Sequence, residues 1–277
     1  MLVAITRPIS PRFNDCELTH LGRVEIDMES AQRQHAAYVI ALESLGARVV
    51  RLAEEPDMPD SVFVEDAAVV VDELALITRP GAASRRLETR AVEAALGRYR
   101  DIARIEAPGT IDGGDVLTLG REVYVGASTR TNEDGVDQMR AALAPHGYGV
   151  HSVPIRGCLH LKSAVTQVSE GALLINPEWV DRKHFAGWEF VEVAPEEPSA
   201  ANALFLPRGT IYPSHFPATR KRLESAGVPL CLVDASEVAK AEGAVTCCSI
   251  VFEVRQEPAP TWRRLGRRVN SDERVVD

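Results

Sequence analysis

The sequence predicts an α/β protein built from a structural repeat arranged around an axis. Runs rich in Val, Ile and Leu, typical of strands, alternate with amphipathic helix patterns along the whole chain. A unit of one polar element, two strands joined by a tight turn and a helix recurs at a spacing of about 40 to 50 residues. If the units surround an axis, the polar residues that begin them converge. These residues are Glu65, Asp66, Asp112, His160, Asn202 and Cys247.

Each predicted element has a local reason. Residues 29–46 place Ala31, Tyr38 and Leu42 at helical spacing and stop at Gly46, a common C-terminal cap. Similar helical patterns cover 84–97, 129–147 and 217–227, and apolar runs predict strands at 2–6, 47–52, 230–234 and 243–254. Paired strands are predicted within 60–80, 109–128, 157–177 and 200–214.

Length and charge restrict the function classes. The chain has 277 residues, enough for one large domain or two ordinary ones, and a formal net charge of −9. That charge disfavours nucleic acid as a partner and is compatible with a small cationic substrate. No apolar run reaches the roughly 18 residues of a membrane helix, and the start lacks the pattern of a signal peptide. We therefore expect a cytoplasmic protein that does not bind membranes.

The cysteines predict reduced thiols, one of which is reactive. They are odd in number, five, and show no C-x-x-C spacing, which argues against a disulfide framework and against a structural zinc site. Cys247 and Cys248 stand side by side in "GAVTCCSIVF", which we predict to be a strand. Because successive side chains of a strand face opposite sides, only one can point into a given cavity. Cys248 shares its face with Ile250 and Phe252, so we expect it to be a core residue and Cys247 to be the reactive thiol.

A reactive thiol needs a group that moves protons, and His160 is the candidate. It lies between two leucines, a place where a structural histidine is the alternative. Carboxylates embedded in apolar sequence need a cationic partner, and two clusters qualify. Either a guanidinium ligand or a metal ion satisfies them, although no second histidine stands at ligand spacing. The acidic residues are Asp60, Glu65, Asp66, Asp112 and Asp115.

Arginines stand at the expected starts of two helices. The helix dipole disfavours a cation there, so Arg85, Arg86 and Arg130 are candidates to bind an anion such as a substrate carboxylate. A solvated helix face is the alternative.

Six motifs in order make the sequence similar to the dimethylarginine dimethylaminohydrolases, members of the guanidino-group-modifying superfamily. They are "PDSVFVEDAAVV", "TRPGAASRR", "PGTIDGGDVL", "VGASTRTN", "LHLKS" and "TCCS", and the resemblance covers roughly residues 1–253. It implies a pentein propeller of five ββαβ modules around a pseudo-fivefold axis, in agreement with the repeat. It also implies hydrolysis of asymmetric dimethylarginine or monomethylarginine to citrulline and the methylated amine, without a cofactor or metal.

The resemblance implies a role for each matching residue. Cys247 matches the nucleophile, His160 the general acid and base, and Asp112 the acidic residue near the histidine, which is Glu in some members. The remaining matches imply substrate binding. The α-amino group is bound by Asp60 and the backbone carbonyls of Leu18 and Ala241. The α-carboxylate is bound by Arg85 and Arg130, and the guanidinium by Glu65 and Asp66.

Two other functions stay open. Hydrolysis of unmethylated arginine, or transfer of its amidino group, uses similar residues, but those enzymes are typically longer and this chain has no room for an inserted helical domain. A pentein that binds guanidino compounds without turnover is the third interpretation, which the combination of thiol and histidine disfavours. We expect one catalytic domain over 1–254 and a mobile Arg-rich tail over 255–277. A homodimer is compatible with the sequence.

Overall fold

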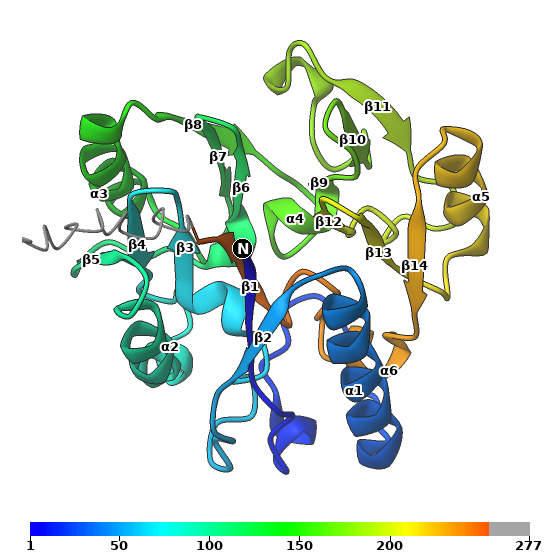
Figure 1. Ribbon diagram of the computed structural model, residues 1–277, viewed down its shortest axis with the longest axis horizontal. Coiled ribbons are helices and arrows are strands. Elements are labelled where there is room, and N and C mark those ends of the chain that lie inside the picture. Colours follow the sequence, from blue (N-terminus) through cyan, green and yellow to red (C-terminus); the bar gives the residue numbers. More distant parts are fainter. Residues whose placement is uncertain (255–277) are drawn as a thin grey trace, which may run out of the picture.

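Five small three-stranded sheets surround a common centre in the computed structural model, which describes residues 1–254 (Figure 1). The strands are Leu2–Thr6 (β1), Arg48–Arg51 (β2), Ala68–Val70 (β3), Leu74–Ile77 (β4), Asp101–Arg104 (β5), Val116–Leu119 (β6), Glu122–Ala127 (β7), Gly149–Pro154 (β8), Val165–Gln167 (β9), Ala172–Ile175 (β10), Glu189–Glu192 (β11), Leu204–Leu206 (β12), Gly209–Pro213 (β13), Leu230–Val233 (β14) and Ile250–Glu253 (β15). The sheets are ordered β15-β1-β2, β3-β4-β5, β6-β7-β8, β9-β10-β11 and β12-β13-β14.

Every sheet has the same topology. Its middle strand pairs antiparallel with the first strand and parallel with the third. A parallel pair needs a crossover connection, which a helix on the outside of the ring supplies in four modules (Figure 1). The helices are Met28–Ser44 (α1), Thr89–Leu96 (α2), Glu133–Leu143 (α3), Leu161–Ala164 (α4), Pro217–Ser225 (α5) and Ser236–Ala239 (α6). In the β9–β11 module the short 3₁₀ helix Arg182–His184 occupies the crossover position. The predicted α/β propeller of five modules is confirmed.

One module is assembled from both ends of the described chain. β1 lies between β15 and β2, with Ala4 opposite Val251. The backbones of Met1 and Val254 exchange hydrogen bonds, with N···O distances of 2.8 Å in both directions. The last strand therefore closes the ring of modules.

The crossover helices bury one apolar face against their own sheets. Val92 and Leu96 of α2 pack with Ile77 of β4, and Met139 of α3 packs with Val125 of β7. Burial of side chains of this size contributes about 1.5–3 kcal/mol each. The cores thus lie between the sheets and the helices, whereas the first strands of all five sheets line a cavity at the centre of the ring.

The predicted helix over 29–46 is confirmed as α1. It begins where the carboxylate of Asp27 accepts hydrogen bonds from the backbone N–H groups of Glu29 and Ser30, both 3.1 Å. It ends before Gly46, which has a φ of +93° that favours glycine.

The predicted strand around the cysteine doublet is wrong in part. β15 begins only at Ile250, and Val245–Cys248 form a turn in which the backbone N–H of Ser249 donates to the carbonyl of Thr246 at 3.3 Å. Within the predicted paired strands of 157–177, the first strand begins only at Val165, and His160 is the extended residue directly before α4. Alternation along a strand therefore cannot be the reason why the two cysteines differ.

Within residues 1–254, no helix is long and apolar enough to cross a membrane. The expected Arg-rich tail, 255–277, lies outside the described residues.

Candidate active site

The polar residues that begin the modules do converge. Asp66 lies in the 3₁₀ helix Val64–Ala67, which leads into β3, while Asp112 precedes β6, His160 precedes β9 and Cys247 precedes β15. Asp66, His160 and Cys247 line one small cavity, and Asp112 lies behind its wall in contact with His160. The cavity is lined by Glu17, Asp60, Phe63, Asp66, Arg85, Arg130, Leu159, His160, Ala241, Glu242, Gly243 and Cys247. Distant segments of the chain thus bring seven of the predicted site residues to one cavity. They are Asp60, Asp66, Arg85, Arg130, His160, Ala241 and Cys247.

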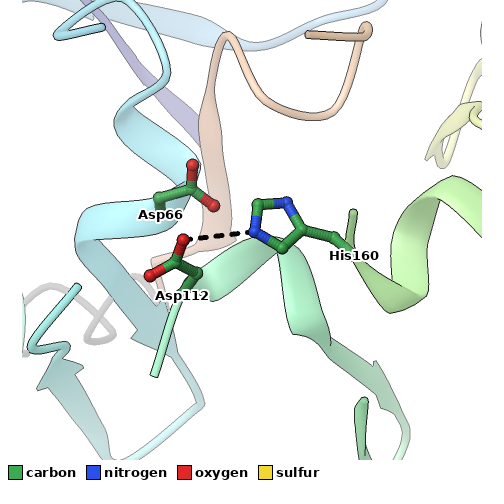
Figure 2. A group of neighbouring side chains, drawn as sticks. All are labelled: Asp66, Asp112 and His160. Atoms are coloured by element: carbon green, nitrogen blue, oxygen red, sulfur yellow. Dashed lines mark hydrogen bonds and ion pairs between the residues drawn. The ribbon is translucent and has the colours of Figure 1, made fainter. Parts of the chain in front are cut away.

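His160 is an imidazolium held among carboxylates. Figure 2 shows its ring directed at Asp66 and Asp112, and its Nε2 lies 3.2 Å from Oδ2 of Asp112. Burial alone would lower the pKa of His160, but Asp66, Asp115 and Asp112 raise it to about 9. At neutral pH the side chain therefore carries a proton that it can give away. Asp112 does not line the cavity and contacts the site through His160.

Two glycines separate Asp112 from Asp115, and the second makes room for the imidazole. A methyl group on Gly114 would lie 2.5 Å from Nδ1 of His160 and 2.9 Å from Oδ1 of Asp66. The backbone N–H of Gly114 also donates to that Oδ1, at 2.9 Å. Only a residue without a side chain fits between the two groups.

Replacing Gly114 with alanine is expected to lower kcat/KM about 100-fold, because displacing a catalytic group by about 1 Å can cost that much. Steady-state kinetics with the substrate that the resemblance implies, a methylated arginine, measure this loss. Gly171→Ala is the matched control, since nothing lies within 4 Å of a Cβ at that position. Equal activity of Gly114→Ala and Gly171→Ala would contradict the placement of the imidazole.

Asp115 holds the backbone next to His160. Its buried carboxylate accepts a hydrogen bond from the backbone N–H of Leu161 at 3.1 Å, and others from the hydroxyls of Ser128 and Thr131. Burial raises the pKa of Asp115 to about 6, against the effect of His160 and the two hydroxyls. Asp115 therefore fixes the direction in which the side chain of His160 projects from the backbone.

Asp66 is an anion clamped by Arg85. The Nη1 of Arg85 donates to Oδ2 of Asp66 at 2.6 Å. Burial opposes the charge of Asp66, but Arg85 and His160 lower its pKa to about 2. A negative group is thus fixed beside the cavity at all physiological pH values.

Arg85 is itself buried and held by Glu88, a residue that the sequence reasoning missed. The Nε and Nη2 of Arg85 donate to the carboxylate of Glu88, with the shortest N···O distance 2.9 Å. Its Nη2 also donates to the carbonyls of Asp60 and Phe63 at 3.3 Å. Burial raises the pKa of Glu88 to about 7, although Arg85 opposes this. The spacing of three residues between Arg85 and Glu88 was the available signal.

Glu65 does not line the cavity, although we predicted a contact with the guanidinium of a substrate. Its carboxylate accepts hydrogen bonds from Nζ of Lys162 at 2.6 Å and from the hydroxyl of Thr246 at 2.8 Å. Asn202 fixes Thr246 in turn, through two hydrogen bonds of 3.0 and 3.1 Å. Glu65 therefore lies behind the cysteine turn, and its backbone N–H donates to the carbonyl of Cys247 at 3.2 Å.

Leu18 also does not line the cavity, whereas its neighbour Glu17 does. The side chain of Leu18 packs on the core beside α1. The backbone N–H of Glu17 donates to both carboxylate oxygens of Asp60, 3.2 Å each, and Ala241 also lines the cavity. Arg130 is nearby and lies 4.0 Å from Asp112, measured from Nη1 to Oδ2.

A turn, and not the alternation of a strand, separates the two cysteines. The turn places Cys247 on the cavity wall, whereas Cys248 is 4% exposed and belongs to the core beside α1. Burial raises the pKa of the Cys247 thiol well above its usual value, and Glu65 and Asp66 raise it further. Burial also raises the pKa of Cys248, to about 12. All five cysteines are free.

Asp66, Asp112 and His160 also form a group that could hold a metal ion, because one potential ligand atom of each lies within 4.8 Å of the others. Both oxygens of Asp66 already accept hydrogen bonds, from Arg85 and Gly114. The expectation that the site uses no metal stays a prediction.

The fold and the site together define a class: a pentein enzyme whose cysteine and histidine flank a pocket rich in carboxylates. The solved Pseudomonas aeruginosa dimethylarginine dimethylaminohydrolase, a cysteine-to-serine variant complexed with citrulline, superimposes with a TM-score of 0.86 and 36% identity over 90% of this chain and 98% of that one. The N-terminal domain of ArgZ, an arginine dihydrolase from cyanobacteria, superimposes with a TM-score of 0.82 over 90% of this chain and 97% of that one; at 20% identity it shows the fold alone.

Sequence comparison specifies the family. A family model described as "N,N dimethylarginine dimethylhydrolase, eukaryotic" matches residues 18–186. The N(G),N(G)-dimethylarginine dimethylaminohydrolase of Streptomyces coelicolor is 42% identical over 89% of this chain and 95% of its own. That of Pseudomonas aeruginosa is 38% identical over 84% of this chain and 92% of its own. The chain therefore belongs to the dimethylarginine dimethylaminohydrolase family.

Proposed function

We propose that the protein hydrolyses Nω-methylated arginines, namely asymmetric dimethylarginine and monomethylarginine, to citrulline and dimethylamine or methylamine. The observation that carries the proposal is the convergence of Cys247, protonated His160 and anionic Asp66 at one cavity. A nucleophile, a proton donor and a fixed anion are the groups that displacement of an amine from a guanidinium requires. The family of the two relatives supports the same reaction.

The cavity wall suits both ends of an amino acid. Arg85 and Arg130 are proposed to bind the α-carboxylate, and Asp60 with the carbonyls of Leu18 and Ala241 the α-amino group. The contacts of Arg85 with Glu88 and Asp66 hold its guanidinium in one orientation before a ligand arrives. We propose that Asp66 faces the substrate guanidinium. Glu65 is proposed to act on the same guanidinium through its charge, from its place behind the cysteine turn.

The reaction would proceed by two displacements. The thiolate of Cys247 attacks the central carbon of the guanidinium and forms a C–S bond. His160 gives its proton to the dimethylated nitrogen as the C–N bond breaks, which leaves a covalent thiouronium and free dimethylamine. The now neutral His160 takes a proton from water, which attacks the same carbon. Collapse of this second adduct breaks the C–S bond and expels the thiolate, and the hydroxyl proton leaves to solvent, so that citrulline remains. Asp112 stabilises the imidazolium whenever it is charged.

Ionisation of Cys247 is the step that the substrate assists. In the free protein, burial and the anions Glu65 and Asp66 keep the thiol protonated. A bound cation offsets these anions, so it lowers the pKa of the thiol and the proton leaves to solvent. The substrate thereby activates its own nucleophile.

Alkylation of Cys247 should therefore shift to lower pH when a non-reactive guanidinium ligand occupies the site. The rate of inactivation by iodoacetamide, followed as a function of pH with and without the ligand, measures this. A shift of one pH unit corresponds to about 1.4 kcal/mol of stabilisation of the thiolate. An unchanged or upward-shifted profile would contradict activation by the substrate.

One assay separates the three candidate functions. The protein is incubated with arginine, monomethylarginine and asymmetric dimethylarginine, and citrulline and the released amines are quantified. Citrulline with methylated amines supports the proposal, whereas citrulline and ammonia from arginine alone indicates an arginine deiminase. Saturable binding without product at any enzyme concentration indicates a guanidino-compound binding protein.

We place the enzyme in the cytoplasm, a reducing compartment that suits its five free cysteines.

A further inference from the structure

The segment Glu17–Leu21 begins at the active-site cavity, which Glu17 lines, and forms no helix or strand. Other modules hold it at several points. Its first residue contacts Asp60 through the backbone, and its carboxylate accepts a hydrogen bond from the hydroxyl of Ser84 at 2.6 Å. The Nη2 of Arg130 donates to the hydroxyl of Thr19 at 2.9 Å. Most of the segment is exposed, so these polar contacts determine its position.

Glu242 makes several of the hydrogen bonds that hold the segment. Its carboxylate accepts hydrogen bonds from three consecutive backbone N–H groups, those of Thr19, His20 and Leu21, with N···O distances of 3.0, 2.5 and 2.6 Å. Successive backbone N–H groups directed at one point form a binding site for an anion. Because the acceptor is ionised, such bonds are about twice as strong as neutral ones.

The backbone of Glu242 is unusual as well. It has a φ of +57°, the only positive value at a residue other than glycine within 1–254. Glycine would adopt this conformation without strain, so its occupation by glutamate indicates that the side chain serves a purpose. Its neighbours Ala241 and Gly243 line the active-site cavity.

We propose that Glu242 is a positioning residue, which pins the Glu17–Leu21 segment so that the carbonyls of Leu18 and Ala241 stand ready together for the substrate's α-amino group. This rests on the proposed function. An ammonium group has three donors, and Asp60 with the two carbonyls offers it three acceptors. Ala241 is fixed by the chain after α6, whereas Leu18 depends on the segment. Glu242 links the two carbonyls, because Glu242 follows Ala241 directly in the chain and its carboxylate binds Thr19, the neighbour of Leu18.

The test uses Glu242→Gln and Glu242→Gly. The glycine variant removes the carboxylate but suits the positive φ, so it separates the contact from backbone strain. Glu237→Gln is the matched control: this carboxylate on α6 also accepts a backbone N–H, that of Asp27 at 2.9 Å, but lies outside the segment contacts. Each variant is assayed with asymmetric dimethylarginine and with the analogue that lacks only the α-amino group.

Both variants are expected to raise KM for asymmetric dimethylarginine about tenfold or more, since hydrogen bonds to charged groups contribute about 1.5–3 kcal/mol. Their kcat should stay within about threefold, and kcat/KM for the analogue should change little. An equal loss with both substrates, a loss confined to kcat, or no loss would overturn the proposal, as would an identical effect of Glu237→Gln.

Hydrogen exchange gives a readout that does not depend on turnover. The amides of Thr19, His20 and Leu21 should exchange at least about tenfold faster in both Glu242 variants, while those of β1 stay protected. Unchanged exchange in the segment would overturn the pinning. If the wild-type protein turned over no methylated arginine, the proposed function would fail, and the exchange experiment would still decide whether Glu242 holds the segment.

Discussion

Cys247→Ser is expected to lower kcat for asymmetric dimethylarginine by at least about 10³-fold, because a serine hydroxyl in this site is not ionised at neutral pH and removal of a covalent nucleophile typically costs more than that. Cys248→Ser should keep kcat within about tenfold, since its thiol lies in the core and not on the cavity wall. Citrulline formation measures both.

The two variants control for each other. Both exchange one sulfur for oxygen at neighbouring positions, and thermal unfolding should show the larger loss of stability for Cys248→Ser, which buries a hydroxyl among apolar groups. Citrulline formation that survives in Cys247→Ser and disappears in a folded Cys248→Ser would show that the turn assigns the two thiols wrongly.

His160→Gly is expected to lower kcat for asymmetric dimethylarginine by about 10²–10⁴-fold, the usual contribution of general acid–base catalysis. The imidazolium, whose pKa is raised to about 9, supplies the proton without which dimethylamine is a poor leaving group. A substrate whose leaving group needs no proton should bypass this step. With S-methyl-L-thiocitrulline, which releases methanethiol, the variant should still form its covalent adduct on Cys247.

That adduct should then accumulate, because the variant also lacks the base that activates water. Mass spectrometry of the intact protein follows the adduct, and His151→Gly is the control, since His151 is exposed on β8 and interacts with Glu122 at the surface. Equal losses with the two substrates would contradict the role of His160 as the acid that protonates the amine.

The overall architecture and the convergence of the site could be predicted from the sequence. Polar residues stand two to five residues before the first strand of successive units, and in a ring of modules those positions converge. Asp66, Asp112, His160 and Cys247 follow this rule in the structure. The helix of residues 29–46 could also be predicted, because its apolar spacing and its terminal glycine both indicate a helix that ends at Gly46.

The local structure at the cysteines could not be predicted in this way. "GAVTCCSIVF" reads as one apolar strand, but hydrogen bonds from Asn202 to Thr246 and from the Glu65 backbone to Cys247 hold its first half in a turn. These partners are far away in the sequence, so no periodicity reports them. The same is true of Lys162, which turns Glu65 away from the cavity, and of Glu242, which holds the segment around Leu18.

Direct detection of the covalent intermediate tests the central claim, that Cys247 attacks the guanidinium carbon. The protein is mixed with asymmetric dimethylarginine, quenched with acid within the first turnover and digested with trypsin. A transient adduct is expected on the peptide that follows Lys240, with the mass of the substrate cation less dimethylamine, located on Cys247 by fragmentation. Citrulline formation with an adduct on Cys248, or with none at any quench time, would contradict it.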